Sequence, residues 1–387
     1  MIKNRDYKKE YLVDDFLAGL TVAIVALPLA MAFAIASGVS PEKGIYTAIV
    51  AGILMSVFGG SKFAIGGSTG AFVVILYDIV MKFGYEGLAV ATIMAGIILI
   101  LMGIFQFGSI IKFIPYPVIT GFTSGIALII FSSQIKDFLG LNIENLPSEL
   151  IPKIISIFNH MHETNLYAIL IGVLSILLII YTKKVFPKVP GPIIAVIFGI
   201  VLIEVFSLPI DTIESKFGEI PNTLPTPTFA FDITIEKIKL LIPSALTIAL
   251  LAAIESLLCA VVADGMTGDR HKSNTELISQ GIGNIIATIF GGISATGAIA
   301  RSATNIKANA KSPLAGIFHG IILFLFMYLF ASIIVKVPLV TLAAILIVVS
   351  YNMSEIKHFK SLLKAPRSDV LVLVLTFLLT VLVNLTV

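Results

Sequence analysis

The sequence predicts an all-α integral membrane protein built from two inverted repeats, and three observations lead to this prediction. Of the 387 residues, 57% are hydrophobic and 13% are charged, whereas about 25% are charged in ordinary soluble domains. The mean hydropathy of +1.04 shows that the average residue prefers an apolar solvent. Long apolar segments recur along the whole chain, and one pattern of residues occurs twice in it.

The composition also excludes several classes of protein. A soluble enzyme, a disordered scaffold and a secreted disulfide-rich module would all carry more polar residues. The single cysteine, Cys259, allows no intramolecular disulfide, and no Cys/His cluster predicts a metal site or a cofactor. The net charge of +3 is too small to indicate nucleic acid as a partner. Without a phosphate-binding loop or a nucleophile motif, we expect neither an ATP-driven pump nor an enzyme.

The apolar segments follow a short polar N-terminal stretch that lacks the features of a cleaved signal peptide. They lie near 17–37, 44–59, 68–81, 87–107, 113–135, 165–182, 190–208, 240–263, 275–291, 300–306, 313–335, 337–351 and 369–387. A bilayer span needs about 20 residues. Segments 68–81 and 300–306 are too short, and each follows a glycine-rich stretch. Two polar stretches, about 136–164 and 209–238, are expected as external loops. Residues 1–387 therefore form one membrane domain.

Basic residues predict the orientation of the chain in the membrane. With a cytoplasmic N-terminus, all the strongly basic loops fall inside, namely those with Lys62, Lys112, Lys183/Lys184/Lys188, Arg270/Lys272, Lys307/Lys311 and Lys357/Lys360/Lys364/Arg367. We therefore expect a multi-pass protein of the cytoplasmic (inner) cell membrane, in contact with the lipid bilayer.

An internal repeat appears at an offset of 232 residues. Residues Gly52–Gly60 (GILMSVFGG) align without a gap with Asn284–Gly292 (NIIATIFGG). Seven segments precede the second copy, and this odd number gives the two copies opposite orientations. We expect repeat one at about 12–208 and repeat two at about 236–387. The same register aligns Ser68, Thr69 and Gly70 with Ala300, Arg301 and Ser302.

The inverted repeat has a consequence for the two short segments. They point in opposite directions from the middle of the membrane, so their N-termini converge. Each N-terminus exposes unpaired N–H groups and about half a positive charge, which together form a natural anion site. Discontinuous helices of this kind mark the binding sites of transporters. The sequence therefore predicts an anion transporter.

Two groups of polar residues stand at these N-termini. Arg301 is predicted to place a fixed positive charge beside the anion, although it could instead pair with Glu255 as a structural Arg. Ser68 and Thr69 offer hydroxyl groups, although serine and threonine also join helices in membranes. Phe33 and Phe72 are candidates for the wall of the pocket, or for simple packing.

Glu255 lies near the middle of segment 240–263, where an ionisable residue costs at least about 2.5–3.5 kcal/mol. One hypothesis makes it a carboxylate that couples transport to protons. The alternative is a permanent ion pair that braces two helix bundles. Cys259, one turn further on, faces the same side and is interpreted as a small packing residue.

Several stretches resemble the sulfate permease (SulP) family, over nearly the whole chain. They are ALPLAMAFAIASGVSPEKGIYTAIVAGI (26–53), IGGSTGAFVVIL (65–76), PYPVITGFTSGIALI (115–129), AIESLLCAVVADGMTG (253–268), SNTELISQGIGNIIATIFGGISATGAIARSATNIKANAKSPLAG (273–316) and YNMSEI (351–356). The similarity is greatest to the bacterial branch of C4-dicarboxylate transporters, which implies a dicarboxylate such as succinate or fumarate as substrate.

The resemblance implies fourteen segments in two inverted repeats of seven, arranged as the core and gate domains of a UraA/SulP-like fold. It implies a homodimer with elevator-type alternating access. Substrate would lie between the N-termini of segments 3 and 10. The site residues that it implies are Phe33, Thr69, Gly70, Ala71, Phe72, Glu255, Cys259, Ala300, Arg301 and Ser302.

This sequence departs from the family pattern in three ways. It ends inside or just after segment 13, so the last segment and the STAS domain are expected to be missing. Leu29 stands where animal members often carry glutamine. Cys259 stands where sodium-coupled members use threonine, and a thiol is a poor sodium ligand.

Together these observations predict secondary active, proton-coupled uptake of a C4-dicarboxylate or of sulfate. The alternatives are a sodium-coupled bicarbonate transporter, an anion exchanger and, in a different class, an anion channel. Nucleobase–cation symporters share the architecture but have acidic residues near segment 10, where this chain has Arg301.

Overall fold

The computed structural model describes residues 9–109, 115–143, 146–186, 189–228 and 234–382. Nearly all of the regular secondary structure in these residues is helical, as the composition predicts. The elements of the first half are α1 (Lys9–Ala36), α2 (Pro41–Phe58), β1 (Gly66–Gly67), α3 (Gly70–Ile104), α4 (Tyr116–Leu139), α5 (Leu150–Asn159), η2 (Met161–Glu163), α6 (Leu166–Val185) and α7 (Gly191–Phe206). The remaining elements are α8 (Ile213–Phe217), α9 (Ile235–Thr267), α10 (Ser273–Ile289), β2 (Thr296–Gly297), α11 (Ile299–Lys307), α12 (Leu314–Ile334), α13 (Leu339–Met353), α14 (Ile356–Leu362) and α15 (Arg367–Leu382).

The helices have the lengths that a bilayer requires. Within the described ranges, seven helices are long and apolar enough to span a membrane. Prolines and glycines set several of their ends: Pro41 occupies the first turn of α2, and Gly268 ends α9 in the left-handed conformation. The stretches expected as external loops contain the short helices α5 and α8 rather than irregular chain alone.

The two halves of the chain contain matching sets of helices. Gly84 (φ 68°, ψ −178°) breaks α3 into two segments, so α1, α2, both parts of α3, α4, α6 and α7 form one set of seven. Helices α9 to α15 form the other. The prediction that a segment is missing is therefore wrong. Helix α14 has only seven residues, of which Lys357, His358 and Lys360 are basic, so it gives no apolar run in the sequence.

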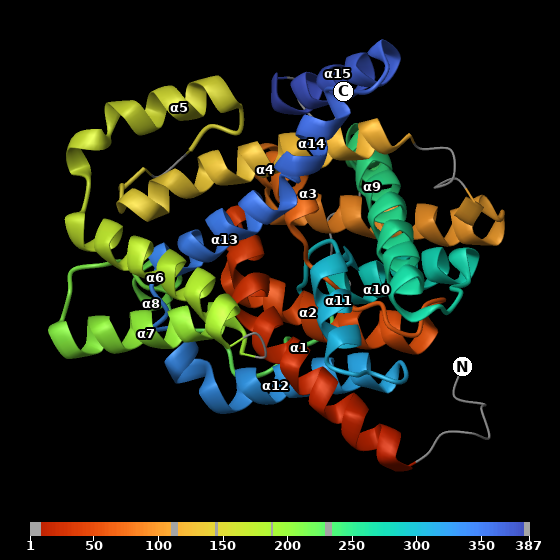
Figure 1. The fold of residues 1–387 in the computed structure, drawn as a ribbon, viewed down its shortest axis with the longest axis horizontal. Helices are drawn as coiled ribbons and strands as arrows, with labels where there is room; N and C mark the ends of the chain where they lie inside the picture. The colour runs from red at the N-terminus through yellow and green to blue at the C-terminus, as the bar shows by residue number, and fades with distance from the viewer. Residues whose placement is uncertain (1–8, 110–114, 144–145, 187–188, 229–233, 383–387) are drawn as a thin grey trace.

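The helices pack in two groups. Helices α1, α2, α3, α9, α10, α11 and α12 contact one another, as α4, α6, α7, α13, α14 and α15 do. Contacts of α1 with α13 and of α3 with α4 join the groups. Figure 1 shows α6 and α7 at one end of the molecule and α9 and α10 at the other, with α1 and α13 between them. These groups correspond to the core and gate that the resemblance implies.

Candidate functional site

The two short segments approach each other through extended backbone, as the repeat predicts. Strands β1 and β2 pair antiparallel, with Gly66 opposite Gly297 and Gly67 opposite Thr296. The Ala298 N–H extends this pairing and donates to the Ile65 carbonyl at 2.8 Å. Helices α3 and α11 begin directly after the two strands, so their N-termini lie at one place inside the core group.

The structure corrects the register of the repeat at this point. Helix α3 follows its N-cap Thr69, whereas α11 follows its N-cap Ala298. Each extended stretch that leads into a short helix is called a crossing segment here. Counted from the aligned glycines Gly60 and Gly292 to the two N-caps, the second crossing segment is therefore three residues shorter than the first. Because of this deletion, Arg301 corresponds to Phe72 in the fold, and not to Thr69 as the ungapped alignment predicts.

Arg301 is buried between the two crossing segments, with 2% of its surface exposed. Its Nη2 donates to the Ser68 carbonyl at 3.2 Å, and its Nη1 has no hydrogen-bond partner. Its guanidinium lies against bare backbone: a Cβ on Gly67, which has φ +153°, would lie 2.2 Å from Nη1. Among the described residues no carboxylate forms an ion pair with Arg301, so the alternative in which it pairs with Glu255 is not observed.

Two hydroxyl groups beside Arg301 are also unsatisfied. Ser68 Oγ and Thr69 Oγ1 are buried and have no hydrogen-bond partner. An unpaired buried donor or acceptor costs about 1–3 kcal/mol, and native structures contain few of them. Three such atoms on Ser68, Thr69 and Arg301, beside the N-terminus of α3, indicate a site for a ligand that accepts hydrogen bonds.

The other predicted residues either lie beside the start of α3 or take part in packing and hydrogen bonding within the protein. A Cβ on Gly70 would lie 3.3 Å from Phe33, so this aromatic ring covers the start of α3. Ala71 and Phe72 are buried in the core cluster, whereas Ala300 is exposed. Ser302, by contrast, has no free hydroxyl, because its Oγ accepts from the Ile65 N–H at 2.9 Å and contacts Cys259.

Helix α9 holds the second crossing segment in place. Ser256 Oγ lies 2.6 Å from Thr296 Oγ1 and accepts from the Gly297 N–H at 3.1 Å. One turn later, Cys259 Sγ lies 3.1 Å from Ser302 Oγ, which fits its interpretation as a small buried residue. Glu255 directly precedes Ser256 on α9. It is 8% exposed and forms no hydrogen bond or ion pair with any residue that the structure describes.

The comparison with protein families decides the identity of the fold. A model of the sulfate permease family matches residues 12–376. The chain belongs to this family. A protein of Bacillus subtilis (strain 168) named "Putative sulfate transporter YvdB" is 48% identical over 382 residues, which are 98% of this chain and 72% of that protein. The bicarbonate transporter BicA of Picosynechococcus sp. (strain ATCC 27264 / PCC 7002 / PR-6) is 32% identical over 394 residues, covering 96% and 67%.

Solved structures of this family have the same fold. The transmembrane domain of a cyanobacterial bicarbonate transporter BicA superposes with a TM-score of 0.89 at 28% identity, covering 98% of this chain and 97% of that one. The structure of SLC26A9 shares the fold with a TM-score of 0.87 at 20% identity, covering 98% of this chain and 64% of that one. The superposition with the BicA domain thus includes helices of both sets described above.

This permease fold also depends on polar residues that the sequence analysis did not single out. Of the five buried polar residues of helix α10, four are separated by four positions each, Glu276, Gln280, Asn284 and Thr288; the fifth is Ser279. Asn284 accepts from the Ala295 N–H and donates to the Ala295 carbonyl, both at 2.8 Å. Glu276 accepts from the backbone N–H groups of residues 60 and 61. The regular spacing of polar residues within an apolar segment was the signal that could have found them.

Proposed function

We propose that this sulfate permease family member is a secondary active transporter whose anion binds between the N-termini of α3 and α11. The observation that carries this proposal is the buried guanidinium of Arg301, which has no carboxylate partner among the residues described and lies beside two unsatisfied hydroxyls, those of Ser68 and Thr69. An oxyanion supplies the negative charge and the acceptor oxygens that these groups lack. The two helix N-termini add their partial positive charges.

Sulfate is the first substrate to test, and a C4-dicarboxylate is the second. Both offer the pair of negatively charged oxygens that a guanidinium and neighbouring hydroxyls bind. A relative with 48% identity is named a sulfate transporter, whereas the dicarboxylate rests on the resemblance of sequence strings. Bicarbonate, named for BicA, has a smaller charge and is the third.

Glu255 is proposed to couple transport to protons. An ionised carboxylate in a buried position without a partner loses several kcal/mol of hydration. A bound anion nearby further favours the protonated carboxyl, so that one proton and one anion stabilise each other's binding. The core group would then carry both across the membrane by moving against the gate group, in an elevator-type step.

The placement in the membrane is part of the proposal. We propose a homodimer in the cytoplasmic membrane with its N-terminus inside, because the basic loops then face the cytoplasm. Cys259 is the single cysteine, so Cys259→Ser gives a background for labelling. In that background Lys62→Cys should react with an impermeant maleimide from the inside, and His162→Cys from the outside. The reverse pattern would contradict the orientation.

Transport into proteoliposomes tests the function and the coupling together. Labelled sulfate and succinate are supplied with and without an inward proton gradient. The wild type should concentrate one of them when the gradient is present. Glu255→Gln resembles the protonated state, so it should lose this acceleration and keep anion exchange across the membrane.

A second carboxylate on α9 provides the matched control. Asp264 Oδ2 already has a partner in His271, 2.7 Å away, so Asp264→Asn should retain the response to the gradient. Gradient-driven accumulation that persists in Glu255→Gln would reject the coupling role. Discrete single-channel currents in the wild type would reject carrier transport in favour of a channel.

A further inference from the structure

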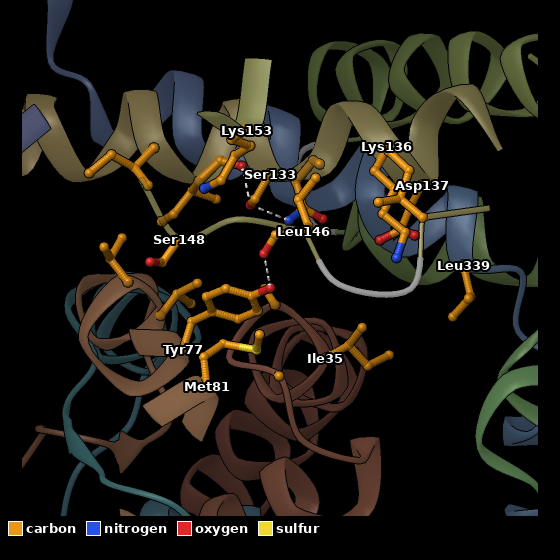
Figure 2. A pocket seen from close by; sticks show the side chains of 18 of the residues that line it. Ile35, Tyr77, Met81, Ser133, Lys136, Asp137, Leu146, Ser148, Lys153 and Leu339 are labelled. Atoms are coloured by element: carbon orange, nitrogen blue, oxygen red, sulfur yellow. Dashed lines mark hydrogen bonds between the residues drawn. The ribbon is translucent and has the colours of Figure 1, made fainter. Parts of the chain in front are cut away.

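A cavity with polar and apolar lining lies between the two helix groups, on the outer side of the first turns of α3. It has a volume of about 520 Å³ and is lined by the end of α1, the first turns of α3, the end of α4, and residues of α5 and α8. Figure 2 shows Lys153 entering this cavity from α5 above Tyr77, with Lys136 and Asp137 at the other end. With the orientation proposed above, all of these elements lie on the outer side of the membrane.

Helix α5 buries its charged residue, Lys153, beside Ile157 and exposes most of its other apolar residues. Lys153 is 3% exposed, whereas Ile151, Ile154 and Phe158 are 61%, 51% and 73% exposed. A helix at the surface of a soluble domain shows the opposite pattern. The exposed apolar face suits the surface of a bilayer, but this explains only why the apolar residues point outward. It gives no reason for a lysine on the buried face.

The ammonium group of Lys153 has no partner in the described part of the chain. A buried cation is normally paired, because its lost hydration is otherwise uncompensated. The neighbouring cation differs: Lys216 Nζ lies 3.3 Å from Asp211 and donates to Asn142 at 3.1 Å. Burial lowers the pKa of Lys153 to about 8, so it remains mostly charged at neutral pH, without a counter-ion.

The charges around the cavity are mainly positive. Among the described residues that line it, three are lysines, Lys136, Lys153 and Lys216, and one is a carboxylate, Asp137. Lys216 is paired with Asp211. The walls also present Ser133, Gln134 and Ser148, which are hydrogen-bonding side chains. A confined positive field of this kind concentrates anions and raises their rate of entry.

The cavity is separated from the proposed anion site by one layer of side chains. Ile130 and Val73 line the cavity. A Cβ on Gly70, the first residue of α3, would lie 3.4 Å from Ile130. An anion in the cavity is therefore next to the site formed by Arg301, Ser68 and Thr69, on the path between that site and the outside.

We propose that this cavity is an outer subsite for the transported oxyanion, in which the ammonium of Lys153 holds the anion before it reaches Arg301. This inference rests on the proposed anion transport and orientation. Lys153 acts on entry from the outside, and the final site forms without it. Its removal should therefore affect influx and efflux differently, which a general packing defect would not do.

The test compares Lys153→Met with Lys153→Arg in proteoliposomes, with labelled sulfate on one side at a time. Lys153→Met should raise the KM for entry from the outer side about 5-fold to 10-fold. The rate of entry at saturating sulfate and the KM from the inner side should change less than about twofold, and the maximal rate of exit should then fall by about the factor by which the outer KM rises, because a variant cannot alter the transport equilibrium. Lys153→Arg should behave as the wild type. An equal KM on the outer side for Lys153→Met and wild type would overturn the subsite.

A lysine on the same side provides the control. Lys336 lies 3.0 Å from Glu204 and does not line the cavity, so Lys336→Met removes the same charge and should leave KM unchanged. The pH profile gives a second readout. The KM of the wild type from the outer side should rise above about pH 8, where Lys153 loses its proton, and Lys153→Arg should remove this rise. Lys136, Asp137, Lys216 and Tyr77 face the same cavity and are present in both proteins.

Direct binding separates failure of the subsite from failure of the transport proposal. Binding of labelled sulfate to purified Arg301→Ala isolates the outer cavity from the site at α3. This residual binding should fall when Lys153→Met is added and should persist with Lys336→Met. If the wild type moves neither sulfate nor succinate but Lys153-dependent binding is found, the transport proposal fails and the cavity remains an anion-binding site. If Lys153→Met leaves the binding unchanged, the subsite is rejected whatever the transport result.

Discussion

The two crossing segments come from equivalent parts of a repeat, yet their polar groups are satisfied very differently. In the second segment, Thr296, Ala295 and Gly297 are all bonded to side chains of α9 or α10. In the first segment, the hydroxyls of Ser68 and Thr69 are buried without a partner. Antiparallel pairing joins the two segments through β1 and β2. One copy has therefore become a fixed support, and the other presents free groups.

This difference shows how an inverted repeat can make an asymmetric site. The second segment, which acts as the support, also positions the positive charge, because α11 places the guanidinium of Arg301 against the backbone at Gly67. Arg301 takes the position that Phe72 has in the other copy, so an ion and an aromatic ring occupy equivalent places. Rigid placement of a charge costs no reorganisation when the ligand binds. The second copy would thus supply charge and position, and the first would supply hydrogen bonds.

The largest expected effect on anion binding is the loss of affinity in Arg301→Ala. A hydrogen bond to a charged group contributes about 1.5–3 kcal/mol, which corresponds to about 10-fold to 150-fold in the dissociation constant. Expression and dimerisation should remain close to those of the wild type, because the lost contact is mainly to the ligand. Calorimetry on the purified protein measures the affinity directly.

The variant Arg301→Lys sharpens this prediction. Lysine keeps the charge but loses the fork of donors, so it should recover part of the affinity. Unchanged affinity in Arg301→Ala would reject the site and would make the unpaired guanidinium a structural feature.

The next effect falls on stability rather than on affinity. Asn284→Ala removes both hydrogen bonds to the backbone of Ala295 and leaves two buried backbone groups unpaired, at a cost of about 2–4 kcal/mol. The apparent Tm in detergent should fall by several degrees. Exposed Asn159→Ala controls for loss of an amide. A Tm equal to that of the wild type would show that β2 does not depend on α10.

Much of the fold could be predicted from the sequence, since apolar length and glycine-rich approaches are local properties. The half-helices 68–81 and 300–306 were recognised in this way, and the structure brings their N-termini together. Helix α14 was not recognised, because a short basic helix lacks the apolar run on which the prediction depended. The predicted register beyond the aligned glycines Gly60 and Gly292 was wrong, because an ungapped alignment cannot reveal a three-residue deletion.

The candidate site was predicted in its residue types but not in its bonding. Arg301 and Thr69 were named for their position at the half-helices, and the structure shows that both carry unpaired atoms. Ser302 was named for the same reason, yet its hydroxyl contacts Ile65 and Cys259. Which hydroxyl is free depends on neighbours distant in sequence, and a single sequence gives no information about them.

The smallest effects give the most direct test of the comparison, because the same substitution can be made in both segments. Thr69→Val removes a hydroxyl that has no protein partner. It should raise the KM about 3-fold to 10-fold, the value of one hydrogen bond, and leave the Tm unchanged or slightly higher. Thr296→Val removes a hydroxyl that contacts Ser256 at 2.6 Å. It should lower stability by about 1 kcal/mol and leave KM within about twofold. If the two variants gave the same combination of KM and Tm changes, the division between supporting and ligand-binding segments would be wrong. If Thr69→Val changes only the KM and Thr296→Val changes only the Tm, the first copy supplies hydrogen bonds to the anion, separately from the charge of Arg301.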